Sequence, residues 1–313
     1  MKIVFMGTPD FGIPSVEKLI EKGYEISAVV TAPDKERGRG KKVTPTPIKE
    51  FAIDKDIINF SPISLRDKNF IEQLHKINPD LFITAAFRIL PREVYTIPKY
   101  GSINLHGSLL PKYRGAAPIQ WAIINGETET GLTTFLLEDK VDTGNIILQE
   151  IISIEPEDNF GTLYEKMKYI GAKLLVTTVE LIEKGNIKYL KQDDTLATPA
   201  PKITKEICRI NWSKSANEIH NLVRGLSPHP AAFFEYNGKI FKVYKTKVVD
   251  TECESNVPNS SLVNNILLQD RIIQTKKELL VQTIKGTLQL IELQPEGRKR
   301  ITTEEFLRGY SLI

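Results

Sequence analysis

The chain has 313 residues and a mass of 35.4 kDa, enough for two domains of ordinary size. Its 41% apolar and 26% charged residues exclude a disordered chain, a collagen-like repeat and a coiled coil. The net charge is only +3, yet residues 207–313 hold 15 Lys and Arg against 11 Asp and Glu, whereas residues 1–206 hold 27 against 28. Such an excess is typical of a solvated face or of a surface for a polyanion.

The first elements form a strand–turn–helix–strand unit. An apolar run at residues 3–6 stops at Gly7, residues 14–22 have helical spacing, and residues 26–30 are apolar and β-branched. Strand-like and helical patterns alternate downstream, with strands at 81–85, 102–105 and 132–137 and helices at 48–53 and 70–77. This alternation predicts an α/β domain with a doubly wound, mostly parallel (Rossmann-like) sheet.

A long amphipathic helix is predicted over residues 161–184, with Gly185 as its stop. Residues 192–201 are polar, carry two prolines and lack periodicity, which indicates a linker. A short helical pattern follows at residues 216–224. We therefore expect an N-terminal domain at residues 1–189, a linker at 190–206 and a C-terminal domain at 207–313.

The C-terminal part is rich in short β-patterns. Residues 231–236 and 239–244 flank Asn237-Gly238, a strong hairpin signal, and residues 256–265 are expected to form a long loop. Three more strand-like runs lie at 272–274, 278–283 and 288–293. Five or so short strands in this space predict a small, OB-like β-barrel.

Several classes of protein are excluded by simple counts. Cys208 and Cys253 cannot form a disulfide framework, and the four histidines lie too far apart for a zinc site, so we expect no metal. The longest apolar run is too short to span a membrane, and the N-terminus lacks the pattern of a signal peptide. A reducing cytoplasm is the expected compartment.

Two loops near the N-terminus could bind phosphate. The turn at Gly7–Gly12 follows a strand and opens a helix, but its spacing is not that of a dinucleotide site, so a tight turn is the simpler interpretation. Residues 32–47 hold five cations, two glycines and three prolines, which predicts a loop. Either this loop is merely solvated, or it contacts the phosphates of a nucleic acid.

The densest chemistry lies at residues 102–118. Strand alternation places Asn104 and His106 on one face at the end of a strand, where open α/β sheets bind ligands. An amide and an imidazole together can stabilise an oxyanion and move a proton. Asp142, in the turn Asp142-Thr143-Gly144, could orient His106. An aspartic protease is disfavoured because the chain has no second Asp-Thr/Ser-Gly.

These residues carry a family resemblance. Asn104-Leu105-His106, Ser108–Pro111, Tyr113–Pro118 and Asp142–Gly144 resemble the formyl-tetrahydrofolate-dependent formyltransferases. The start at Gly7–Phe11, the basic loop, and the C-terminal stretches at 224–232 and 294–299 extend the resemblance from residue 3 to about 310 and narrow it to members that act on an aminoacyl-tRNA.

The resemblance implies that the α-amine of initiator methionyl-tRNA attacks the formyl carbon of 10-formyltetrahydrofolate, without a covalent enzyme intermediate. Asn104 and protonated His106 would hydrogen-bond the oxyanion, and Asp142 would hold His106 and help to take up the amine proton. The folate would contact three loops, through Phe87, Arg88, Ile89, Leu90, Ser108, Leu109, Leu110, Pro111, Glu138 and Asp139. The tRNA would contact the basic loop, through Arg37, Arg39, Lys41 and Lys42. A monomer without membrane contact is expected.

The sequence departs from the family at one place. Family members often have a glycine after the aromatic residue that corresponds to Phe87, whereas here Arg88 follows it directly. Either the backbone that lines the folate differs, or Arg88 contacts the glutamate of the folate.

Two other functions stay open from the sequence. A folate enzyme acting on a sugar or ribonucleotide amine, or a formyl-folate hydrolase, needs neither the basic loop nor a second domain. A non-catalytic RNA-binding protein needs none of Asn104, His106 and Asp142.

Overall fold

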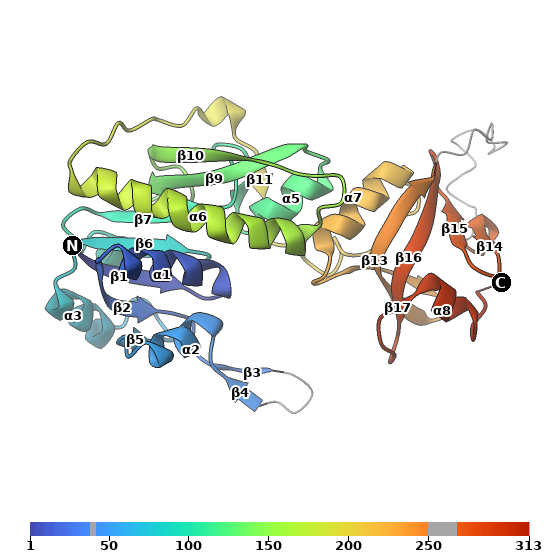
Figure 1. Ribbon diagram of the computed structural model, residues 1–313, viewed down its shortest axis with the longest axis horizontal. Helices are drawn as coiled ribbons and strands as arrows, with labels where there is room; N and C mark the ends of the chain where they lie inside the picture. Colours follow the sequence, from blue (N-terminus) through green and yellow to red (C-terminus); the bar gives the residue numbers. More distant parts are fainter. Residues whose placement is uncertain (38–41, 250–267, 313) are drawn as a thin grey trace. The chain divides into compact units, whose positions relative to one another are not determined.

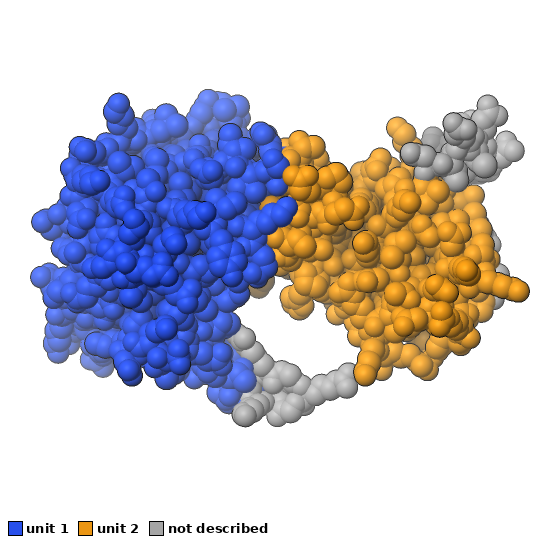
Figure 2. Space-filling view, in the orientation of Figure 1, with its two compact units in different colours: residues 1–118, 129–153, 164–201 blue, residues 119–128, 154–163, 202–313 orange. Residues whose placement is uncertain are grey.

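The computed structural model describes residues 1–37, 42–249 and 268–312. The chain forms two compact units, which Figure 2 colours separately. Unit 1 comprises residues 1–118, 129–153 and 164–201, and unit 2 comprises residues 119–128, 154–163 and 202–313. In the described ranges, no helix is both long and apolar enough to cross a membrane.

Unit 1 is built on a mixed sheet, in which seven strands of the described chain run in the order β10-β9-β7-β6-β1-β2-β5. The five strands from β7 to β5 are parallel, and β9 runs antiparallel to both of its neighbours. Their bounds are β1 Lys2–Gly7, β2 Glu25–Val30, β5 Asn59–Phe60, β6 Leu81–Ala85, β7 Ser102–His106, β9 Glu129–Leu136 and β10 Ile146–Ser153. The expected Rossmann-like α/β sheet is confirmed.

Helices cover both faces of this sheet (Figure 1). On one face, α3 and α4 pack Phe70, Leu74 and Val94 against Val4 and Phe82. On the other, Gly171 of α6 lies so close to Leu105 of β7 that an added Cβ would stand 2.9 Å from it. The helices of this unit are α1 Ile13–Glu21, α2 Pro47–Asp54, α3 Lys68–Ile77, α4 Arg92–Tyr95 and α6 Phe160–Glu183, whose first four residues belong to unit 2, while α5 Pro118–Ile124 lies in unit 2 except for Pro118.

The turn between β1 and α1 is tight, because a Cβ on Gly12 would lie 2.5 Å from the Phe5 ring. A short helix, η1 (Asp10–Gly12), places the Asp10 carboxylate beside Lys168 Nζ at 2.7 Å and Tyr164 OH at 2.8 Å. Although burial opposes it, these hydrogen bonds lower the pKa of Asp10. An ionised carboxylate at this turn disfavours phosphate, which supports the structural interpretation over a dinucleotide site.

The basic segment contains a short hairpin rather than only a loop. Strands β3 (Lys35–Arg37) and β4 (Lys42–Thr44) pair antiparallel, with Arg37 opposite Lys42. The β-branched residues Val43 and Thr44 favour an extended chain, a signal that the glycines and prolines around them obscured. Two predicted tRNA-binding residues, Arg39 and Lys41, lie outside the described residues.

Unit 2 is a curled antiparallel sheet packed against α7 (Ala216–Leu226), which begins with a capping box between Ser215 and Glu218. Its described strands follow the order β12-β13-β16-β15-β14, with β17 beside β16. They are β12 Ala232–Tyr236, β13 Lys239–Val249, β14 Ile272–Gln274, β15 Leu279–Gln282, β16 Thr287–Pro295 and β17 Ile301–Thr302, with η4 Leu268–Arg271 before β14 and α8 Thr303–Leu307 at the end. This confirms the expected small β domain; the predicted loop at 256–265 lies outside the described residues.

The hairpin at the start of this sheet turns where the sequence predicts. Asn237 and Gly238 both have positive φ, 49° and 70°, as a type I′ turn requires. Behind the hairpin, Phe234 and Phe241 stack with ring centroids 5.3 Å apart, and Phe306 of α8 meets Phe241 edge-on. These rings lie in a core formed with α7.

Unit 2 also includes two segments that interrupt unit 1 in the sequence. Gly225 of α7 packs so closely on α5 that a Cβ would stand 2.6 Å from Ile124. Arg224 Nη1 donates to the carbonyl oxygens of Glu155, Pro156 and Asp158 at 3.1 to 3.2 Å. Unit 2 is therefore assembled from three separate stretches of chain.

Candidate active site

The candidate site lies at the carboxyl end of β7. Parallel strand β6 flanks β7 on one side, and antiparallel strand β9 flanks it on the other. Because Leu105 points toward α6, strand alternation directs Asn104 and His106 to the opposite face. Ligands of open α/β sheets bind at this edge.

Asn104 is oriented by a threonine on the neighbouring strand. Thr84 Oγ1 of β6 donates to Asn104 Oδ1 at 2.7 Å. With its oxygen held in this way, the amide presents Nδ2 as a donor. Asn104 is half-buried, so this donor can act on a ligand at the strand end.

We expect Thr84→Val to lower kcat about 10-fold, because the amide of Asn104 loses the bond that orients it. Valine keeps the shape, so the melting temperature should change little. Steady-state kinetics provide the measurement. Thr134→Val is the matched control, since Thr134 makes a similar buried bond of 2.8 Å to Thr178 away from Asn104. A loss of similar size in both variants would contradict an orienting role.

His106 is almost fully buried, with 5% of its surface exposed. Its Nε2 lies 2.9 Å from the carbonyl oxygen of Tyr113. A carbonyl only accepts, so Nε2 carries a hydrogen and donates it. The other ring nitrogen, Nδ1, faces Asp142 Oδ2 at 3.9 Å, too far for a hydrogen bond. Nδ1 is therefore the ring atom at which a proton is gained or lost.

Asp142 occupies the loop after β9 in a left-handed conformation, with φ of 54°. Its Oδ2 accepts a hydrogen bond from the backbone amide of Gly115 at 2.9 Å. Two residues on, Gly144 passes so close to β9 that a Cβ would collide with the carbonyl oxygen of Leu136 at 1.7 Å. The turn needs glycine there, which explains the Asp-Thr-Gly sequence.

The sequence did not reveal the residues that hold this site. Thr84, the carbonyl of Tyr113 and the amide of Gly115 position Asn104, His106 and Asp142 respectively. Gln192, in the segment expected as a linker, bonds the Asp142 loop. The contact between Thr84 and Asn104 could have been predicted from strand register, because the two residues lie opposite each other in adjacent parallel strands. The other contacts depend on loop conformation.

The three loops predicted to contact a folate converge at the same edge. Loop 86–91 leaves β6, loop 107–113 leaves the adjacent β7, and Leu137 of the third loop packs in the cluster that holds Leu90. Asp139 accepts hydrogen bonds from Arg92 Nη1 at 2.7 Å and Tyr95 OH at 2.5 Å, which fix the third loop on α4. The bond to Asp139 raises the pKa of Tyr95.

The predicted folate contacts differ in how much surface they offer. Ile89 is 74% exposed, whereas Ser108 and Leu110 are buried. Ser108 Oγ donates to the carbonyl of Lys112 at 2.6 Å, and the amide of Leu110 donates to a threonine of β9. The remaining predicted contacts are Phe87 and Leu109, which are half-buried, Leu90, which is buried, and Pro111, Glu138 and Asp139, which are at least partly exposed.

Arg88 clamps the chain beneath its own loop. Its guanidinium donates to the carbonyl oxygens of Pro62 at 2.9 Å and Ile63 at 3.0 Å, and it stacks 5.3 Å from the centroid of Phe87. Burial lowers its pKa, and its Nε has no partner in the described part of the chain. The guanidinium is thus committed to backbone carbonyls.

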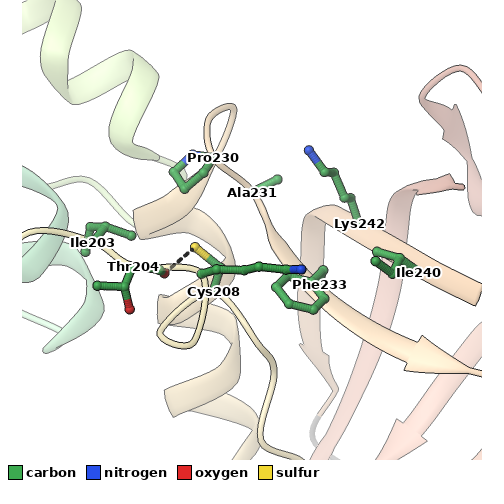
Figure 3. Close-up of a pocket in the computed structure, with 9 residues that line it drawn as sticks. Ile203, Thr204, Cys208, Pro230, Ala231, Phe233, Ile240 and Lys242 are labelled. Atoms are coloured by element: carbon green, nitrogen blue, oxygen red, sulfur yellow. Dashed lines mark hydrogen bonds between the residues drawn. The ribbon is translucent and has the colours of Figure 1, made fainter.

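A separate hollow of about 320 Å³ lies in unit 2 (Figure 3). Its floor is the outer face of the β12–β13 hairpin, and it contains the buried Cys208, whose Sγ donates to the carbonyl of Thr204 at 3.2 Å. Burial raises the pKa of this thiol. The lining residues are Ile203, Thr204, Lys205, Cys208, Pro230, Ala231, Phe233, Ile240 and Lys242.

The described residues contain no group of three or more His, Cys, Asp or Glu side chains that could hold a metal. The candidate site offers an amide, an imidazole whose Nδ1 faces the carboxylate, and the carboxylate itself, which are groups that can donate hydrogen bonds and transfer protons.

Comparisons with known proteins agree along the whole chain. Residues 1–179 match the family model described as formyl transferase, and residues 202–311 match the model of the formyl transferase C-terminal domain. A methionyl-tRNA formyltransferase of Clostridioides difficile is 45% identical and one of Caldanaerobacter subterraneus is 44% identical, each over all of this chain and 98% of the relative.

Solved structures share the fold at lower identity. The sugar 3N-formyl transferase WlaRD, crystallised with dTDP and 5-N-formyl-THF, is similar with a TM-score of 0.68 at 21% identity, over 96% of this chain and 99% of that one. A methionyl-tRNA formyltransferase from Clostridium thermocellum is similar with a TM-score of 0.56 at 16% identity, over 80% of this chain and 95% of that one.

Proposed function

The chain belongs to the formyl transferase family, and on that premise we propose that it transfers the formyl group of 10-formyltetrahydrofolate to the α-amine of initiator methionyl-tRNA. The product is formylmethionyl-tRNA, used to start translation. The observation that carries the choice of acceptor is the identity of 44 to 45% over the full chain with two methionyl-tRNA formyltransferases. The structural similarity to a sugar formyltransferase is evidence for the fold only.

We propose that the folate ring binds at this edge of the sheet, and two exposed apolar side chains support this. Ile89 and Val141 are apolar side chains that stand 74% and 48% exposed on two of the converging loops. Exposed apolar side chains at the ligand edge of a sheet are typical of a binding surface. The folate supplies the formyl carbon, and Phe87 and Ile89 would hold its ring.

In the proposed reaction, the C–N bond to the amine forms and the C–N bond to the folate breaks. Asn104 Nδ2 and the protonated Nδ1 of His106 donate hydrogen bonds to the oxygen on which negative charge develops. Asp142 stabilises the imidazolium and takes a proton from the attacking amine. That proton passes from Asp142 to the leaving nitrogen of the folate, so Asp142 is ionised again and the proton count balances.

We propose that the basic loop, at residues 32–47, contacts tRNA phosphates. Replacement of Arg37, Arg39, Lys41 and Lys42 by Ala should raise the KM for tRNA and leave folate binding near normal. Removing one phosphate contact flattens the slope of log affinity against log salt concentration by about 0.7 to 0.9. Kinetics at several salt concentrations measure both effects. The control removes the same charge from helix ends and turns, by replacement of Lys22, Lys55, Lys68 and Lys76 with Ala. An unchanged KM for tRNA in the basic-loop variant would contradict the proposed phosphate contacts.

One assay tests the whole proposal. Formyl transfer is measured with initiator methionyl-tRNA, elongator methionyl-tRNA and a free small amine, each at several salt concentrations. We expect the initiator tRNA to be the preferred acceptor, with a steep salt dependence. Equal turnover of the small amine, or none with the initiator tRNA, would refute the proposed acceptor.

The proposal extends to the oligomeric state, the compartment and the domains of the enzyme. The enzyme would act as a monomer in the cytoplasm, with residues 1–189 as the catalytic domain, residues 190–206 as a linker and residues 207–313 contacting the tRNA. Sedimentation at micromolar concentration, alone and with tRNA, measures the oligomeric state.

A further inference from the structure

Gln192 is buried in a segment whose composition predicts a solvated linker. Only 6% of its surface is exposed. Its Nε2 donates to the backbone carbonyls of Asp142 at 3.0 Å and Gly144 at 2.8 Å. These two bonds span the tightest part of the Asp-Thr-Gly turn, and they join residues about fifty positions apart in the chain.

The orientation of the Gln192 amide is determined by an arginine. Arg114 donates from Nε at 3.1 Å and from Nη2 at 2.8 Å to Gln192 Oε1. A guanidinium has no acceptor, so it selects the oxygen of the amide and leaves the NH2 group to face the turn. Gln192 therefore donates to both carbonyls of the turn through its side-chain NH2 group.

The same elements hold the other side of Asp142. Gly115, whose amide donates to Asp142 Oδ2, lies with Arg114 in β8 (Arg114–Gly115). This strand pairs with β11 (Pro199–Ala200), which follows Gln192 after the short helix η2 (Asp194–Leu196). Residues 192–200 and β8 thus fix both the backbone and the carboxylate of Asp142.

We propose that Gln192 is a positioning residue, which holds the Asp142 carboxylate at the Nδ1 side of His106 with Arg114 as its anchor. The inference rests on the transfer reaction proposed above. Asp142 has a left-handed backbone, which costs a non-glycine residue free energy and is stabilised by contacts that constrain it. Gln192 supplies that constraint at the carbonyl of Asp142 itself.

The test replaces Gln192 by Met, which keeps the volume and removes the two hydrogen bonds to the turn together with the two that Gln192 accepts from Arg114. We expect kcat to fall about 30-fold with both KM values within about 2-fold of the wild type, because a small displacement of a reacting group slows the chemical step. Gln192→Glu, which retains the acceptor for Arg114 but not the donor, should be at least as slow. Gln73→Met is the matched control: it makes the same substitution at an exposed position of α3 in the same unit, so the kinetics should stay unchanged.

A double-mutant cycle separates positioning from general destabilisation. In an Asp142→Ala background, Gln192→Met should cause no further loss of kcat, because the group it positions is gone. Full additivity of the two losses would overturn the proposal, and so would a folded Gln192→Met enzyme with normal kcat. A crystal structure of Gln192→Met adds a readout that needs no activity. Asp142 should leave the amide of Gly115, and an unmoved Asp142 overturns the proposal. A wild-type enzyme that formylates no tRNA refutes the proposed function instead, and the crystal structure still decides the role of Gln192.

Discussion

Replacing His106 with Ala is expected to lower kcat about 10³-fold, the size typical of a lost acid–base group. The imidazole is the group whose Nδ1 gains or loses the proton, while its Nε2 is committed to the carbonyl of Tyr113. Of the three candidate residues, only His106 can become a positively charged hydrogen-bond donor, because Asn104 is neutral and Asp142 is an acid. The measurement is single-turnover formyl transfer, which isolates the chemical step from product release.

The control for this variant is His75→Ala. His75 is an exposed histidine near the end of α3 in the same unit, so its removal should leave the rate unchanged. His106→Gln provides a second variant that fills more of the buried site. If either His106 variant is folded and keeps full single-turnover activity, His106 has no part in the chemistry.

Asp142→Asn is expected to lower kcat by about 10³-fold as well, because the amide carries no charge to stabilise an imidazolium and takes no proton from the amine. The side chain still fits, and its oxygen can still accept from the amide of Gly115. Folding should therefore be preserved, which the melting temperature checks. The loss should appear in kcat, with both KM values near those of the wild type.

A matched control exists for the unusual backbone of Asp142. Asp56 also has a left-handed conformation, with φ of 53°, but it is exposed at the turn after α2. Asp56→Asn should be fully active and equally stable. A slow Asp56→Asn enzyme would mean that the substitution acts through the turn conformation and not through the lost charge.

The regular elements with strong local signals follow from the sequence. The predicted strand at 81–85 coincides with β6, and the Asn237-Gly238 hairpin forms with the expected φ values. The strands β3, β4 and β17 were not predicted. They are two or three residues long and are stabilised by pairing rather than by an apolar pattern.

The candidate site was partly predictable for a similar reason. Strand alternation placed Asn104 and His106 on one face, which the structure supports, and the turn at Asp142 supplied a carboxylate that could orient His106. The contacts that position them could not be read from composition, since Thr84, Gln192 and the amide of Gly115 come from distant parts of the chain. A polar segment with two prolines favours a linker by every local rule, and only tertiary contacts make it part of the site.

Arg88 shows how a departure from a family pattern becomes interpretable in three dimensions. The sequence left open whether it contacts the folate glutamate or replaces a backbone feature. Two of its nitrogens donate to the carbonyls of Pro62 and Ile63, so it acts as a brace between two loops. Moving Arg88 to the folate would break both hydrogen bonds. This favours the alternative in which the backbone that lines the folate differs.

The three-part assembly of unit 2 has a consequence for biosynthesis. Residues 119–128 and 154–163 leave the ribosome long before α7, with which they pack. The carbonyls that Arg224 binds therefore stay in water while the next 66 to 69 residues are translated, and Ile124 does so for the 101 residues up to Gly225. Nascent chains of this kind expose apolar surface that chaperones recognise. A nonsense mutation between residues 164 and 224 would thus release a chain that carries both segments without the part of unit 2 against which they pack.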